Sequence, residues 1–485
     1  MGGPKTRITQ ESFDAAVKEN QEELAWRYLS FKAEEALQSA MEEFRLQGVD
    51  LSNIATNPTE GKQAIDAMKK AVEALKVASQ TTGEQSSNPS LLKSMLHVQD
   101  QIQAATPDSL PLILQAANQA DAVPALLTSI KEASNKKDVL LPSLSVLQSL
   151  LSIDASKDAF MRANGAAELQ HLAQTVTGDA QLIEHVALVA EAAAKKHEDN
   201  KCSLVDSGCA SQLVECLRSG AVSSSPAAVQ AVCGCLRSLT TADDPRPAAS
   251  RAFQNSRTLA QQGAPLLLLS ILKQGDITEP VTVAAVCGAA KKLAANEEIC
   301  KELADDGAVQ VTMEVLTSGL GNATLVRSAC SLLRQLANSD AIKAEIVDAG
   351  GLELLCRAVD AHTTHAGKTV TLCWAMEQAL GLLVALTLRN PSAATRAVEV
   401  GCIDTVLEVM NVCQTGVHGK LGQWVQRQAC MSIRNVVARN PELRPIVLDK
   451  GAEPLLRSAK KMFPQSCGDV GSAALRDLDI QDYNT

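Results

Sequence analysis

The sequence predicts an all-α fold, a right-handed α-solenoid in which three-helix units stack into a superhelix. Apolar residues make up 46% of the 485 residues but aromatic residues only 2%. The core is therefore expected to consist of thin aliphatic layers, each packed against its near neighbours. In addition, one phrase recurs along the chain: an apolar helix, a glycine turn and a second apolar helix. A third apolar helix then completes the unit.

Glycine marks the recurring turn. It stands at Gly165, Gly208, Gly263, Gly307, Gly350, Gly401 and Gly451. Three of the intervals are about 43 residues, within the range of armadillo and HEAT units, and three are longer and carry insertions. We expect the glycine to end one helix in the left-handed conformation, so that the next helix leaves at a steep angle.

The third helix of each unit has apolar residues at i, i+4, i+7 and i+10, which form one helical face. Five copies are predicted, over 229–240, 283–294, 326–337, 376–387 and 427–438. A short, a steep and a long helix per unit is the armadillo pattern, whereas a HEAT unit has two helices. With a less regular copy over 110–154, residues 91–480 are predicted to form an armadillo-repeat solenoid of about eight units.

Three segments fall outside the regular array. Residues 1–54 are predicted to be a helical docking segment, which either docks on the solenoid or captures a partner. Residues 55–90 are predicted to be a flexible linker with a short amphipathic helix at about 62–78. Residues 241–262 lengthen one interval and contain paired acids and prolines, so they are predicted to form an exposed functional loop.

Composition and motifs argue against several classes of function. The net charge of −10 argues against nucleic-acid binding. No apolar run is long enough to span a membrane, and no secretory start is evident, so a cytoplasmic or nuclear location is expected. The 14 cysteines show no disulfide framework and read as compact core residues. With no metal-ligand spacing and no catalytic motif, we expect no enzyme activity, no cofactor and no metal site.

Two tryptophans are the leading candidates for partner contact. Trp374 and Trp424 occupy the same position in their third helices, and each is followed four residues later by a glutamine, Gln378 and Gln428. Asn435 continues the second stripe. These stripes lie opposite the buried face and would form two adjacent rungs of a binding groove, with aromatic area and amide donors for a peptide or helix. The alternative is that each tryptophan packs against the loop before its helix.

A basic column borders the same groove. It contains Arg237, Lys291, Arg334 and Arg434. Either these cations bind an acidic peptide, or they reach across the seam between units to neighbouring carboxylates. A column of small residues that includes Gly234, Gly288 and Gly381 is likewise either a low groove floor or a site of tight helix packing.

Several phrases resemble the armadillo repeat-containing protein 6 family. They lie at 8–20, 34–44, 47–54, 241–246, 428–438, 449–456 and 473–478. The sequence departs from the family pattern at 24–32 and in the linker. The resemblance implies a helical adaptor without a known catalytic residue, and it names no partner.

The sequence therefore predicts a non-catalytic scaffold or adaptor, a monomer that binds partner peptides or helices along the concave third-helix groove. The alternative is a transport or assembly factor that carries a client protein. An import receptor of this architecture would repeat tryptophan–asparagine rungs along the groove, and only Asn435 matches that pattern.

Overall fold

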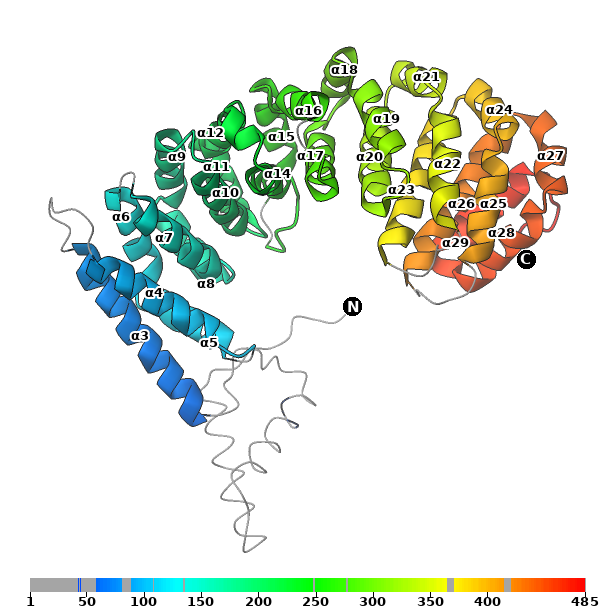
Figure 1. The fold of residues 1–485 in the computed structure, drawn as a ribbon. Coiled ribbons are helices and arrows are strands. Elements are labelled where there is room, and N and C mark those ends of the chain that lie inside the picture. Colours follow the sequence, from blue (N-terminus) through cyan, green and yellow to red (C-terminus); the bar gives the residue numbers. More distant parts are fainter. Residues whose placement is uncertain are drawn as a thin grey trace, which may run out of the picture. The chain divides into compact units, whose positions relative to one another are not determined.

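The computed structural model describes residues 42, 44, 58–80, 89–107, 109–133, 136–246, 249–275, 278–363, 370–413 and 420–484. Its described residues form helices and connecting turns with no strand, so the all-α solenoid is confirmed (Figure 1). The segment predicted to dock, 1–54, lies almost wholly outside the described residues.

The helices follow the order predicted for a three-helix repeat. Before the regular units stand α3 (Pro58–Gln80) and α4 (Pro89–Gln103). The first helices are α5 (Leu110–Gln119), α8 (Asp154–Arg162), α11 (Glu198–Asp206), α15 (Ala252–Gln261), α18 (Glu297–Asp305), α21 (Asp340–Asp348), α24 (Pro391–Glu399) and α27 (Arg444–Asp449). The second helices are α6 (Ala122–Ala133), α9 (Gly165–Thr175), α12 (Cys209–Cys216), α16 (Ala264–Gln274), α19 (Ala308–Ser318), α22 (Gly351–Thr363), α25 (Cys402–Val412) and α28 (Ala452–Met462). The third helices are α7 (Lys137–Leu150), α10 (Ala180–Ala194), α14 (Pro226–Leu239), α17 (Pro280–Leu293), α20 (Ala323–Leu336), α23 (Val370–Thr387), α26 (Lys420–Val437) and α29 (Pro464–Asp477). The short helices α13 (Gly220–Ser223) and η1 (Pro441–Leu443) are additions.

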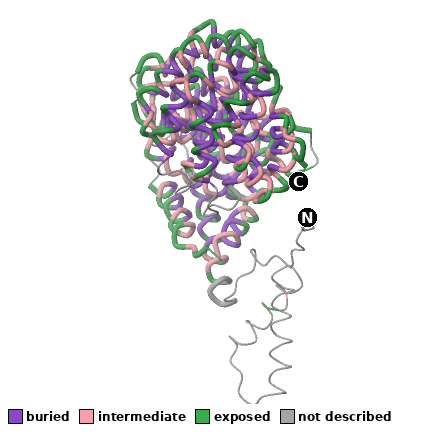
Figure 2. Tube along the Cα trace, turned by 90° about the vertical axis from the view of Figure 1, so that its right-hand side faces the viewer, coloured by how far each residue is buried: buried purple, intermediate pink, exposed green. Residues whose placement is uncertain are grey.

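The chain forms two compact units. One comprises residues 1–213 with 243–248, and the other comprises 214–242 with 249–485. In the second unit the third helices pack in sequence order, α14 on α17, then α20, α23, α26 and α29 (Figure 1). Buried residues run through the interior of the helical layers (Figure 2), and most of them are aliphatic.

Glycine takes the left-handed conformation at six of the seven predicted turns. At Gly208, Gly263, Gly307, Gly350, Gly401 and Gly451 φ lies between 79° and 89°. The first copy differs, because Asn164 adopts φ 55° and Gly165 begins α9. A Cβ on Gly165 would lie 2.6 Å from Cζ of Phe160. This glycine is needed for close packing and not for the turn.

The cysteine column lies in the core, as the helical period predicts. Cys233, Cys287 and Cys330 are fully buried on successive third helices, and Cys430 continues the column on α26. Burial raises the pKa of the first three thiols to about 12. These thiols are therefore protonated at neutral pH and behave as small apolar side chains.

The predicted linker is largely a packed helix. Where a short helix was expected at about 62–78, α3 runs over 23 residues and packs against α4, α5 and α6. It buries Met68, Val72 and Leu75 completely. The apolar residues on one face of α3 pack against these neighbouring helices, so the ordered helical array begins before residue 91. Residues 81–88 lie outside the described part.

The predicted exposed loop at 241–262 is also corrected. Its second half is α15, whose Asn255, Ser256 and Leu259 are buried. Its first half is a strap, residues 243–246, that folds onto the first unit. Asp244 accepts a hydrogen bond from the backbone N–H of Glu198 at 2.7 Å, and Asp243 bonds to the fully buried ammonium group of Lys201. Asp243 thus neutralises a buried cation, and Asp244 accepts a hydrogen bond from a backbone N–H in the first turn of α11.

A second set of ion pairs holds the strap. Arg246 pairs with Asp244 at 2.6 Å and with Asp199 at 3.5 Å. The Arg246 guanidinium, together with the N–H of Glu198, holds the pKa of Asp244 well below its ordinary value, against the opposing effect of burial. The strap is therefore a structural part of the first unit.

Candidate functional site

The candidate site is the surface formed by the exposed sides of α14, α17, α20, α23 and α26, which we call the third-helix face. All five helices belong to the second unit. Each packs on the next (Figure 1). The ordered starts of these helices have identifiable causes: Ser225 caps α14 and Asn322 caps α20 through side-chain bonds to backbone N–H groups.

The first two cations of the predicted basic column reach toward the next helix, and neither forms an ion pair with a described carboxylate. Cδ of Arg237 lies 3.6 Å from the position of a Cβ on Gly288. Nζ of Lys291 donates a hydrogen bond to Oγ of Ser331 at 2.5 Å. Burial and the positive charges around it lower the pKa of the Lys291 ammonium group.

The other two cations of the column do form ion pairs across the seam. Arg334 lies 3.4 Å from Glu377 on α23, and a Cβ on Gly381 would come within 2.7 Å of Cζ of Arg334. Nε of Arg434 lies 3.2 Å from Asp477 on α29. The small residues Gly288 and Gly381 thus accommodate the basic side chain of the preceding unit, which is the tight-packing alternative.

The predicted amide donors are already engaged. Glu377 is only 8% exposed. It accepts a hydrogen bond from Nε2 of Gln428 at 3.1 Å and another from Nε2 of its neighbour Gln378. Because an ionised carboxylate only accepts hydrogen bonds, both glutamines must direct their NH2 groups toward it. The side-chain amide of Asn435 donates to the carbonyl of Val384 at 3.0 Å.

One of the two N–H groups of each glutamine amide is therefore already used within the protein. Oε1 of each glutamine is buried and has no hydrogen-bond partner among the described residues. Because both atoms are closed off from solvent, a partner that docks on the surface does not reach them.

The two tryptophans differ from each other. The guanidinium of Arg327, on α20, lies over the Trp374 ring at 5.4 Å from its centroid, and Trp374 is half-buried. Trp424 is 45% exposed. Of these two tryptophans, Trp424 offers the larger free aromatic surface, since Arg327 already covers one face of Trp374.

Sequence reasoning missed Arg327, Lys292 and Glu377. Lys292 is exposed on α17 beside Lys291. Arg327 and Glu377 occupy the same position in successive third helices, three residues before the buried residues Cys330 and Leu380. Comparing that position across the repeats would have revealed both, because it faces the next helix.

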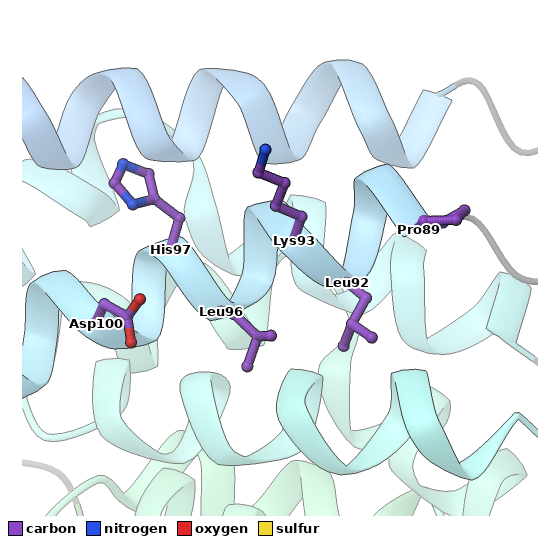
Figure 3. Close-up of a pocket in the computed structure, with 6 residues that line it drawn as sticks. All are labelled: Pro89, Leu92, Lys93, Leu96, His97 and Asp100. Carbon is purple, nitrogen blue, oxygen red and sulfur yellow. The ribbon is translucent and has the colours of Figure 1, made fainter.

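Two surface cavities of the described structure lie on other helices. One of 360 Å³ is lined only by residues of α4, and its side chains diverge: Leu92 and Leu96 point to one side of the helix, Lys93 and His97 to the other (Figure 3). Another, of 630 Å³, lies between α3 and α4. Within the described ranges no three His, Cys, Asp or Glu side chains are grouped to hold a metal ion, and no described helix could cross a membrane.

Comparison with a solved structure supports the fold. The crystal structure of an engineered protein superposes with a TM-score of 0.65 and 17% identity, covering 88% of this chain and 96% of that one. At this identity the likeness concerns the architecture alone.

Sequence relatives identify the family. Residues 5–87 match the model of the armadillo repeat-containing protein 6 N-terminal domain. Armadillo repeat-containing protein 6 of Homo sapiens is 30% identical over 420 residues, covering 79% of this chain and 74% of that protein. The Drosophila melanogaster homolog is 27% identical over 393 residues, covering 79% of this chain and 77% of that protein. The terminal phrases, the repeat pattern and these relatives agree, and the chain belongs to the armadillo repeat-containing protein 6 family.

Proposed function

We propose that this protein is a non-catalytic scaffold or adaptor that binds a peptide or helix of a partner protein along the third-helix face. Armadillo-repeat proteins generally mediate protein–protein interaction, and the family and fold are typically non-enzymatic. The observation that carries the proposal is Trp424, a large aromatic side chain that is 45% exposed. It lies on α26, which packs against α23 within the third-helix face.

The arrangement suits an extended or helical segment better than a small molecule. An exposed indole supplies apolar contact area for a chain laid across α23 and α26. We further propose that the protein acts as a monomer in the cytoplasm or nucleus and does not bind nucleic acid, as its composition predicts.

A test compares the wild type with Trp424→Ala and with Trp374→Ala/Trp424→Ala. Affinity purification with mass spectrometry supplies candidate partners, and calorimetry with each purified partner measures direct binding. We expect at least one partner to be lost in both variants, while the free energy of unfolding falls by less than about 2 kcal/mol, because Trp424 is exposed and Trp374 is only half-buried.

Phe253→Ala is the matched control. Phe253 is 57% exposed on α15, a first helix and not one of the five helices that form the third-helix face, and its loss should leave the partner set unchanged. If all three variants retain every partner, or if the tryptophan variants unfold, the third-helix face is not the binding site.

The second candidate function is a transport or assembly factor. A transport factor would bind its client protein on the same third-helix face, but reversibly, and would release the client after moving it. The two readings separate when the protein is depleted: a carrier's loss relocates its client, whereas a scaffold's loss disperses a complex whose members stay in place.

A further inference from the structure

Four cations cluster on α17 and α20 of the third-helix face: Lys291, Lys292, Arg327 and Arg334. The chain as a whole carries a net charge of −10. The carboxylate that reaches this cluster is Glu377, which also accepts from two glutamines. In the described structure Lys292 and Arg327 are exposed and neither forms an ion pair. The cluster is therefore incompletely neutralised.

The electrostatics of Lys291 support this conclusion independently. Burial, Arg334, Lys292 and Arg327 all lower the pKa of the Lys291 ammonium, and Glu377 only partly opposes them. Its one hydrogen bond to a described side chain goes to Ser331. An ammonium group has three donors, so an incoming anion would both accept hydrogen bonds and relieve repulsion among the four cations.

We propose that Lys291, Lys292, Arg327 and Arg334 form a binding subsite for the carboxylate side chains of an acidic peptide segment whose apolar residue packs on Trp424. The proposal rests on the proposed function and specifies its partner chemically. Charge complementarity favours a short acidic peptide, because its carboxylates meet the positive charge of the four cations. A long polyanion would extend beyond the cluster and be repelled by the rest of this acidic protein.

The helix order sets the spacing within such a peptide. Arg327 lies on α20 and Trp424 on α26, and α23 is packed between these helices. Neighbouring packed helices lie 8–10 Å apart, so the separation is roughly 20 Å. An extended chain advances about 3.3 Å per residue, which places the apolar residue about six positions from the acidic block.

The test uses a fluorescent peptide with three glutamates, a spacer of about five serines and alanines, and a leucine, read by anisotropy. Its controls are the peptide with glutamine in place of glutamate and one with the spacer removed. We expect the full peptide to bind the wild-type chain and its affinity to fall about tenfold or more with either control, and likewise with Lys292→Glu/Arg327→Glu. Lys301→Glu/Arg357→Glu, the same charge change at exposed positions on α18 and α22, should leave binding unchanged.

Each contrary outcome has a distinct meaning. If the glutamine peptide binds equally well and Lys292→Glu/Arg327→Glu has no effect, the acidic subsite is wrong, while loss of binding in Trp424→Ala would still support the proposed function. If the wild type binds none of these peptides, the subsite is overturned, and partner loss in the tryptophan variants decides the proposed function separately. If a labelled single-stranded oligonucleotide binds through the same cations as tightly as the peptide, the ligand is a polyanion and the peptide assignment fails.

Discussion

At the scale of single residues, Glu377 organises the third-helix face. It joins three helices, because Arg334 approaches from α20, Gln378 stands beside it on α23 and Gln428 donates from α26. A buried carboxylate with several charge-assisted partners keeps side chains in fixed positions. Residues around it therefore contribute to the shape of the face, whereas Lys292, Arg327 and Trp424 remain available to a partner.

Lys291→Met should leave stability unchanged or raise it. The folded state lowers the pKa of Lys291, so below the ordinary value of 10.5 the charged lysine destabilises the fold, and this penalty is relieved as pH rises. Methionine keeps the apolar stem and removes the charge. Thermal melts by circular dichroism at pH 7 should show a gain of up to ~2 °C, which shrinks near pH 10. A clear loss at pH 7 would mean that the bond to Ser331 outweighs the repulsion.

Two glycines on this face predict opposite responses to the same substitution. At Gly288 a Cβ would make ordinary contact with Arg237, so Gly288→Ala should stabilise the helix by up to ~1 kcal/mol. At Gly381 a Cβ would collide with the Arg334 guanidinium and displace it from Glu377, which offsets that gain. Urea unfolding of the two variants checks the difference, and equal gains would show that Arg334 moves at no cost.

At the scale of elements, the strap 243–246 shows how an insertion becomes structural. It leaves the end of α14 and supplies acidic groups to α11, where Lys201 is completely buried. Paired acids and prolines are found both in solvated loops and in segments that pack on the protein, so the pattern does not distinguish the two. The difference is whether the acids reach a cation elsewhere in the fold.

Asp243→Ala should destabilise the first unit by about 2 kcal/mol, because it removes a carboxylate that pairs with the fully buried ammonium group of Lys201. Asp66→Asn, at an exposed position on α3, is the control and should change little. Acid should weaken the strap as well: the lowered pKa of Asp244 stabilises the fold above the ordinary value of 3.8, and this contribution is lost as pH falls below that value. If the Asp243→Ala variant unfolds at the same midpoint as the wild type, residues 243–246 are a solvated loop that does not stabilise the first unit.

At the scale of the whole molecule, stability comes from interfaces between adjacent helices. Within the second unit the third helices from α14 to α29 contact their immediate predecessors and successors, as expected for a repeat array in which stability is a sum of unit and neighbour terms. A local defect should therefore stay local.

Asp477→Ala tests this locality. It removes the partner of Arg434 across the α26–α29 seam. Hydrogen exchange followed by mass spectrometry should show faster exchange in α26 and α29 and unchanged exchange in α14 and α17. Faster exchange throughout the second unit would instead indicate one cooperative block.

The sequence by itself determined the helices, their grouping in threes and the family, because helical periodicity and glycine turns depend on residues close together in the chain. It also predicted correctly that the cysteine column is buried and that Trp424 is exposed, since the position of a residue on its own helix face decides whether it is buried. Only the tertiary structure decided which side chains meet: Arg334 and Glu377 lie 43 residues apart, and Gln428 and Glu377 lie 51 apart. Such pairs depend on how units of unequal length stack, and the same long-range stacking turned a predicted loop into a strap and the expected amide donors into ligands of a buried carboxylate.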